Sequence, residues 1–147
     1  MDIQFTGNKP YRANIFDAGA DLITPEELVL VDGKTQLVDT GTAVSIPKGY
    51  VGLVFSRSGL GSKGIRLKNS VGVIDPGYTD TIKVALEYSN NPRPDIYSTR
   101  RLEAGTRIAQ LVIVPIVIPR FVSVEADTFQ DSRGGFGSSG LTELKAA

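Results

Sequence analysis

Residues 71–80, Val-Gly-Val-Ile-Asp-Pro-Gly-Tyr-Thr-Asp, contain the carboxylate best suited to do chemistry. An aspartate before Pro-Gly is typical of a turn, and a purely structural role is one interpretation of Asp75. The residues before it, Gly72, Val73 and Ile74, are apolar, so we expect partial burial that leaves the carboxylate few competing partners. Such a group can orient a water molecule and accept its proton.

A second set of residues is suited to binding an anion. Arg57, Ser58 and Gly59 place a guanidinium, a hydroxyl and a permissive backbone N–H side by side, a combination that binds phosphate groups. A surface ion pair of Arg57 is the alternative interpretation. Gln110 lies in an otherwise apolar run, where a buried amide needs partners from the backbone or from a ligand.

Two other segments have both a plain and a functional interpretation. Residues 17–22, Asp-Ala-Gly-Ala-Asp-Leu, are typical of an ordinary turn. Residues 133–140 hold four glycines among eight residues, which is typical of a flexible tail, but Phe136 within them suits a lid that closes over a flat ligand. On another segment, Lys83 and Glu87 are predicted to be solvated, with Glu87 in a cross-strand ion pair.

Composition limits the kinds of function. The chain has 147 residues, and its 16 basic residues balance its 16 acidic ones, so charge gives no reason to expect binding to nucleic acid or an anionic membrane. The absence of cysteine and histidine excludes a Ser-His-Asp triad and the usual zinc sites, and leaves carboxylates to accept protons and to bind a hard ion such as Mg²⁺. Without a signal-peptide pattern or a membrane-length apolar run, we expect a soluble cytoplasmic protein.

Short β-branched runs between glycine and proline turns predict strands to position these residues. Residues 28–31 end at an Asp-Gly turn, and Pro-Lys-Gly separates residues 43–46 from residues 51–55 at a distance typical of a hairpin. Residues 81–88 alternate between apolar and polar, which predicts a half-buried antiparallel strand. Residues 24–27 resemble a helix start but predict at most a turn.

Residues 107–118 differ from the other strands because both of their faces are apolar. Such a strand lies between two layers or at a subunit interface, so the pattern favours an oligomer. We predict an all-β protein with one domain in residues 1–124, a distorted, β-clip-like jelly roll. A flexible glycine-rich C-terminal arm is predicted for residues 125–147, closing over an active site.

Taken together and in order, five segments resemble the five motifs of the homotrimeric deoxyuridine triphosphatases (dUTPases, or dUTP pyrophosphatases). They are residues 17–22, 55–60, 69–80, 105–111 and 133–140. Each motif is weak alone, but their combination covers nearly the whole chain. The resemblance implies a homotrimer with active sites at subunit interfaces, Mg²⁺ as cofactor, and hydrolysis of dUTP to dUMP and pyrophosphate.

The resemblance also implies roles for individual residues. Asp75 would activate the attacking water, and Tyr78 would pack under the deoxyribose, where a ribose 2′-hydroxyl would clash. Uracil would be recognised in a hairpin slot formed by Asn69, Gly72, Val73, Ile74 and Lys83. The phosphates would contact Arg57, Ser58, Gly59 and Gln110. Asp21 would help through water to place a Mg²⁺ ion held mainly by the triphosphate.

In the fifth motif, Phe136 would stack on uracil as the arm closes and Arg133 would reach the terminal phosphate, with Gly137 and Ser138 also contacting the substrate. Arg133 and Phe136 are closer together in this chain than is usual in the family. Two other positions depart from the family pattern: Asp80 replaces a glycine and Thr106 replaces an aspartate.

Two alternatives remain open at the level of sequence. The dCTP deaminases, including bifunctional deaminase/dUTPase relatives, share this fold, but Ala85 stands where their glutamate is expected, and Glu87 would need a β-bulge to replace it. The other alternative is a non-enzymatic jelly-roll protein with a binding or regulatory role.

Overall fold

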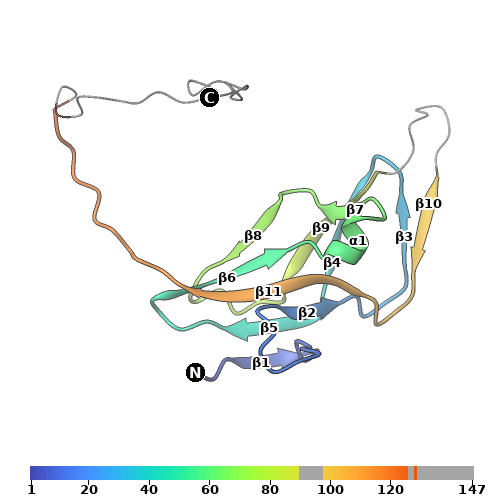
Figure 1. Cartoon of the computed structure of the whole chain (residues 1–147), viewed down its shortest axis with the longest axis horizontal. Coiled ribbons are helices and arrows are strands. Elements are labelled where there is room, and N and C mark those ends of the chain that lie inside the picture. The colour runs from blue at the N-terminus through green and yellow to red at the C-terminus, as the bar shows by residue number, and fades with distance from the viewer. Residues whose placement is uncertain (90–97, 126–127, 129–147) are drawn as a thin grey trace, which may run out of the picture.

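The computed structural model describes residues 1–89, 98–125 and 128, and these form eleven strands and one short helix, α1 (Ser58–Gly61) (Figure 1). The strands are β1 (Gln4–Gly7), β2 (Ala20–Ile23), β3 (Leu28–Val31), β4 (Thr35–Asp39), β5 (Thr42–Ser45), β6 (Tyr50–Phe55), β7 (Ile65–Leu67), β8 (Val71–Ile74), β9 (Lys83–Tyr88), β10 (Thr99–Leu102) and β11 (Arg107–Pro115). The predicted all-β fold, a distorted jelly roll, is confirmed.

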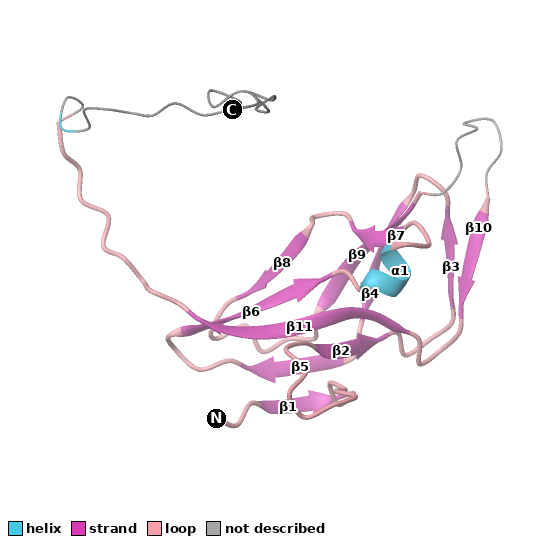
Figure 2. Cartoon of the chain, in the orientation of Figure 1, coloured by secondary structure: helices cyan, strands magenta, loops and turns pink. Residues whose placement is uncertain are grey.

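The strands form small antiparallel sheets that pack around one core (Figure 2). The largest has the order β2-β11-β6-β8, so β11 and β6 are its central strands. A second sheet has the order β4-β9-β7, and the pairs β1-β5 and β3-β10 complete the fold. The largest sheet carries most of the residues predicted to do chemistry, on β2, β8 and β11 and directly after β6.

The predicted hairpin between residues 43–46 and 51–55 is wrong. Although the Pro-Lys-Gly segment does reverse the chain, with Tyr50 N–H donating to the Pro47 carbonyl at 3.2 Å, the flanking strands do not pair. β5 pairs with β1, whereas β6 pairs with β11 and β8. Non-local partners therefore occupy the edges that a local hairpin would have used.

The apolar face predicted for residues 81–88 is confirmed by burial, whereas Glu87 on the opposite face is also buried. Ile82, Val84, Leu86 and Tyr88 point into the core, and both Ile82 and Leu86 are fully buried. They pack with apolar side chains from both larger sheets, among them Leu22 of β2. Burial of these side chains is the main contribution that holds the sheets together.

The strand predicted to be covered on both faces is covered only in its first half. Ile108, Ala109 and Leu111 of β11 are buried. The strand ends at Pro115, and after it Val117 is 89% exposed and Phe121 is 91% exposed. A single chain therefore leaves an apolar segment uncovered, as expected for a surface that a second subunit covers.

The helical content of the described part of the chain is small. Residues 24–27 form a turn, as predicted, in which the Thr24 hydroxyl donates to the Glu26 carbonyl at 2.6 Å. The short helix α1 was not predicted; it follows β6 directly and begins at a residue assigned to anion binding. None of the helices in the described residues is long and apolar enough to cross a membrane.

Candidate active site

The described part of the chain has a polar cavity of about 370 Å³ at the end of β6, beside α1. It is lined by Tyr11, by Ala13 and by residues from three of the predicted motifs. The motif residues are Asp17, Ala18, Gly19, Asp21, Arg57, Ser58, Gly59, Arg107 and Gln110. The fold thus brings together Asp21, Arg57, Ser58, Gly59 and Gln110, as predicted.

Asp21 organises the charges in this cavity. One of its carboxylate oxygens, Oδ1, accepts from Arg57 Nε at 2.7 Å, and the other, Oδ2, accepts from Arg107 Nη1 at 3.1 Å. Arg57 also donates to the Arg107 carbonyl at 3.2 Å. The ion pair that was the alternative interpretation of Arg57 therefore exists, but it lines the cavity. Two guanidinium groups share one carboxylate, which leaves a net positive charge toward an anion.

Arg107 was missed as a site residue by the sequence analysis, although it lies within the fourth motif. Its guanidinium lies over the ring of Tyr11, 5.5 Å from the centroid, where the ring attracts a cation. An arginine opening an otherwise apolar strand three residues before Gln110 was the available signal. Tyr11 gave none, because it belongs to no motif and reaches the cavity only through an isolated bridge to Asp21.

Gln110 is held by the backbone. It lies on β11 opposite Phe55, and its Nε2 donates to the Ser56 carbonyl at 3.0 Å. Gly19 packs directly on this side chain, since a Cβ at Gly19 would lie 2.5 Å from Gln110 Oε1. The glycine of the first motif is therefore required by the amide of the fourth.

Ser58 and Gly59 open α1, and no side chain caps that end of the helix. Arg57, directly before it, has extended backbone with φ −92° and ψ 136°. The Arg57 carbonyl accepts hydrogen bonds from the N–H groups of Leu60 and Gly61 at 3.1 and 2.9 Å. The N–H groups of Ser58 and Gly59, at the start of the helix, take no part in these hydrogen bonds. This geometry suits the predicted contact with phosphate oxygens.

Asp75 follows β8 and lies at the other end of the sheet. Its neighbour Ile74 pairs with Gly52 of β6, whereas Gln110 pairs with Phe55. Gly52 and Phe55 are three residues apart on β6, which corresponds to about 10 Å along the strand. Figure 1 shows β6 running toward α1 and β8 running back away from it. The predicted catalytic carboxylate and the cavity therefore do not meet within one chain.

Asp75 is exposed in the single chain, so the predicted partial burial is wrong for one copy. The apolar residues that precede Asp75 belong to β8, in which Ile74 is half-buried and Val73 is exposed. Tyr78 N–H donates to the Asp75 carbonyl at 3.1 Å and closes the turn, in which Gly77 has φ 91°. A residue with a Cβ would be strained at Gly77, which explains Pro-Gly after the carboxylate.

The other residues predicted to recognise the base lie along β8 and β9. Asn69 precedes β8 at the end nearer α1, and its side-chain amide donates to the Val71 carbonyl at 3.4 Å. Gly72 packs against β6, because a Cβ there would lie 3.2 Å from the Cβ of Val54. Lys83 is exposed, as predicted. Arg133, Phe136, Gly137 and Ser138 lie outside the described residues.

Glu87 is buried rather than solvated, contrary to the prediction, but its predicted cross-strand pair is confirmed. It faces Arg66 across the β7–β9 pair, and Arg66 Nη2 donates to its Oε2 at 3.1 Å. Lys68 donates to the other oxygen. The hydrogen bonds from Lys68 and Arg66 hold the pKa of the Glu87 carboxyl below its usual value, against the opposing effect of burial.

The donor set fits a hydrated metal ion better than a protein cage. Among residues 1–89, 98–125 and 128, no three carboxylates come together as metal ligands. Asp21 already pairs with two guanidinium groups, but a carboxylate has about four lone-pair sites and can still accept from metal-bound water. The residues therefore fit a Mg²⁺ ion that arrives with a triphosphate.

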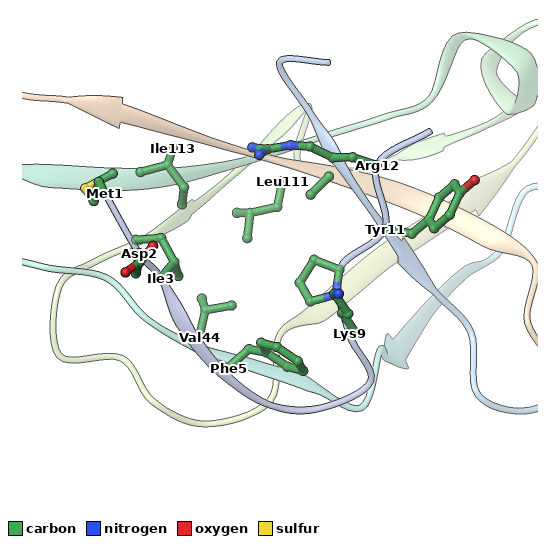
Figure 3. A pocket seen from close by; sticks show the side chains of 12 residues that line it. Met1, Asp2, Ile3, Phe5, Lys9, Tyr11, Arg12, Val44, Leu111 and Ile113 are labelled. Atoms are coloured by element: carbon green, nitrogen blue, oxygen red, sulfur yellow. The ribbon is translucent and has the colours of Figure 1, made fainter. Parts of the chain in front are cut away.

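A larger hollow of about 840 Å³ lies between the N-terminal segment and β11 (Figure 3). Ile3, Phe5 and Val44 border it from one side, and Leu111 and Ile113 border it from the other. None of the described residues predicted to bind substrate lines it. The smaller cavity beside α1 remains the candidate site because its charged groups converge.

Comparison with known proteins gives one consistent result. The dUTPase family model matches residues 7–140. The deoxyuridine 5′-triphosphate nucleotidohydrolase of Tropheryma whipplei (strain Twist) is 43% identical over 150 residues, covering 99% of this chain and 98% of the relative.

Solved structures agree with this match. A Staphylococcus bacteriophage 80alpha dUTPase variant with dUpNHpp aligns with a TM-score of 0.81 and 32% identity, over 95% of this chain and 99% of that one. A dUTPase variant from phage phi11 of S. aureus, described with a structural Mg(II) ion, aligns with a TM-score of 0.76 and 30% identity, over 88% of this chain and 100% of that one.

Proposed function

The chain belongs to the dUTPase family, and we propose that it hydrolyses dUTP to dUMP and pyrophosphate with Mg²⁺. The observation that carries the proposal is the cavity beside α1, where Arg57 and Arg107 share the Asp21 carboxylate and Gln110 presents an amide. Such a set of donors suits the phosphates of a nucleoside triphosphate. The reaction would keep uracil out of DNA and supply dUMP.

Asp75 is the proposed general base. Its carboxylate orients a water molecule and accepts its proton as the water attacks the α-phosphorus. Arg57, Gln110 and the N–H groups that open α1 hold the phosphates in line with that attack. Bound Mg²⁺ would supply positive charge that neutralises the triphosphate, and Asp21 would help to hold it by accepting hydrogen bonds from metal-bound water.

The active site is proposed to form between copies in a homotrimer. The separation of about 10 Å along the sheet between Ile74 and the level of Gln110 leaves Asp75 and the phosphate cavity apart in one chain. A second copy that supplies Asp75 and Tyr78 to this cavity completes the site. The exposed apolar segment after β11 offers a surface on which copies can associate.

Specificity is proposed to come from shape and directed hydrogen bonds. Asn69 and the backbone from Gly72 to Ile74, with Lys83, recognise uracil, and Tyr78 packs under the sugar and excludes a 2′-hydroxyl. Residues 125–147 remain the proposed arm, with Phe136 stacking on the base and Arg133 reaching the terminal phosphate, assisted by Gly137 and Ser138. A cytoplasmic location remains part of the proposal.

The deaminase alternative has less support. Glu87 would have to replace Ala85 through a bulge, but the pairing of β4 with β9 runs without a register shift from Asp39–Lys83 to Thr35–Glu87. The Glu87 carboxylate is also engaged by Arg66 and Lys68. No specific observation favours a non-enzymatic role.

A pyrophosphate-release assay across dUTP, UTP, dTTP and dCTP, with and without Mg²⁺, tests the proposal. We expect dUTP to be strongly preferred, and the Asp75→Asn variant to lose at least about 100-fold in kcat because a general base is removed. Ammonia release from dCTP would support the deaminase instead. If wild type and variant were equally inactive while dUTP still bound, the enzymatic proposal would be wrong.

A further inference from the structure

A chain of hydrogen bonds links the end of β4 to the loop that carries Asp75. The Thr81 hydroxyl donates to Asp39 Oδ2 at 2.7 Å, and the Thr81 carbonyl accepts from the Tyr78 hydroxyl at 3.0 Å. Tyr78 N–H in turn donates to the Asp75 carbonyl at 3.1 Å. Asp39 thus reaches both residues of the proposed chemistry through Thr81, although it lies outside all five motifs.

Asp39 is itself fixed at the end of its strand. It is the last residue of β4 and pairs with Lys83 of β9, and its second oxygen accepts from Gly41 N–H at 2.8 Å. The hydrogen bonds from Thr81 and Gly41 hold the pKa of the Asp39 carboxyl below its usual value. The group therefore remains a charged acceptor at neutral pH, and hydrogen bonds to charged acceptors are stronger than those between neutral groups.

The loop of residues 75–81 is fixed at the end that leads into Ile82, whereas most of the residues before that end are exposed. Ile82 is fully buried, its N–H donates to the Thr42 carbonyl at 2.8 Å, and its carbonyl accepts from Thr40 N–H and Oγ1 at 3.0 and 2.8 Å. Asp75 and residues 77–80 are exposed by contrast. Thr81 lies between these two regions, so its side chain and carbonyl transmit the fixed position of Ile82 to Tyr78.

We propose that Asp39 and Thr81 are positioning residues that set how strongly the protein prefers deoxyribose to ribose. The inference rests on the proposed function, in which Tyr78 packs under the sugar. A tyrosine excludes a single hydroxyl only if its ring is held within a fraction of an ångström, because a loop that moves away makes room for it. The Asp39–Thr81 pair restricts this movement from outside the substrate site.

The ratio of kcat/KM for dUTP to kcat/KM for UTP measures this role. In Asp39→Ala and in Thr81→Val, which removes the hydroxyl without changing the shape, we expect the ratio to fall about fivefold, the effect of one lost hydrogen bond. The double variant should fall no further than either single variant, because both break the same contact. Thr81→Ser, which keeps the hydroxyl, should have the same ratio as wild type.

Glu27→Gln is the matched control, since Glu27, directly before β3, is likewise a carboxylate with a side-chain partner outside its own segment, Arg101 of β10, whose Nη2 lies at 2.7 Å. It should leave the ratio unchanged, as a general loss of stability does not favour one sugar. Equilibrium binding of dUMP and UMP to the same variants gives a second readout that needs no turnover. If Thr81→Val kept the wild-type preference for deoxyribose over ribose by both readouts, the positioning role would be overturned. If the wild-type protein bound dUMP selectively but released no pyrophosphate, only the proposed reaction would be contradicted.

Discussion

Individual residues in this protein depend on partners that sequence motifs do not reveal. Gln110 and Gly19 belong to different motifs, yet the glycine is needed because the amide fills the space where its Cβ would lie. Asp21 was predicted from its motif, but the two arginines that it holds became clear only from the structure. The motif showed which residue types are present, while the contacts show why they are needed.

Glu87 gives a prediction at this scale. Its carboxylate is buried and its pKa is lowered by hydrogen bonds from Lys68 and Arg66, so it stabilises the fold while it is charged. Because the folded pKa lies below the unfolded one, this contribution is complete above the unfolded value and is lost as the pH falls through the folded value. Glu87→Gln should therefore be clearly less stable than wild type at pH 7.

The difference in unfolding free energy between wild type and Glu87→Gln should shrink as the pH falls below the ordinary pKa of a glutamate, and should be lost once the pH has passed through the lowered pKa of the folded Glu87 carboxyl. Chemical denaturation at a series of pH values measures it. Glu103→Gln is a suitable control, because Glu103 is exposed and its hydrogen bonds in the described structure use only its backbone carbonyl. A difference independent of pH would show that the ion pairs do not provide the stabilisation.

At the scale of elements, local patterns predicted strands better than they predicted pairing. The alternation of residues 81–88 was sufficient to predict the strand because one face of β9 lies against the core, where Val84, Leu86 and Tyr88 are buried at the side-chain period of two. Glu87 on the other face is buried as well, which the alternation did not predict. The hairpin between residues 43–46 and 51–55 failed because β6 finds its partners β8 and β11 elsewhere in the chain. Such non-local pairing is decided by the packing of the whole sheet, which no short segment of sequence contains.

The contact between the start of β2 and β11 gives a prediction at this scale. In Gly19→Ala the new Cβ would lie 2.5 Å from Gln110 Oε1, so the amide must rotate away from its hydrogen bond to Ser56. We expect KM for dUTP to rise about five- to tenfold, with about 1 kcal/mol or less lost in unfolding free energy, because the atom displaced is the end of a flexible side chain.

Gly61→Ala is the matched control for Gly19→Ala. A Cβ at Gly61 meets nothing within 4 Å, and alanine favours the helical conformation that Gly61 adopts in α1. Steady-state kinetics and thermal unfolding of both variants provide the comparison. Wild-type kinetics in Gly19→Ala would mean that Gln110 does not contribute to substrate binding.

At the scale of the whole molecule, the proposed site between copies would explain two features of the single chain, the exposed Asp75 and the exposed apolar segment after β11. Asp75 is exposed and lies at the end of the sheet away from the arginines that would hold its substrate. The apolar faces of residues 107–118 predicted an oligomer from sequence, and the exposed segment after β11 agrees with it. The proposed division of motifs between copies could not be predicted from the sequence, because it rests on the directions of β6 and β8.

A mixing experiment tests this division of the site between copies. Asp75→Asn removes the proposed base and Arg57→Ala removes a phosphate ligand, so each variant alone should be nearly inactive. If one copy supplies Asp75 and another supplies Arg57, random mixed oligomers from equal amounts of the two variants should contain intact sites at about one quarter of positions, the product of two independent halves. We therefore expect refolding of the mixture to restore about a quarter of the wild-type pyrophosphate release. Sites formed within single chains would remain inactive in any mixture, because every chain then carries one of the two substitutions.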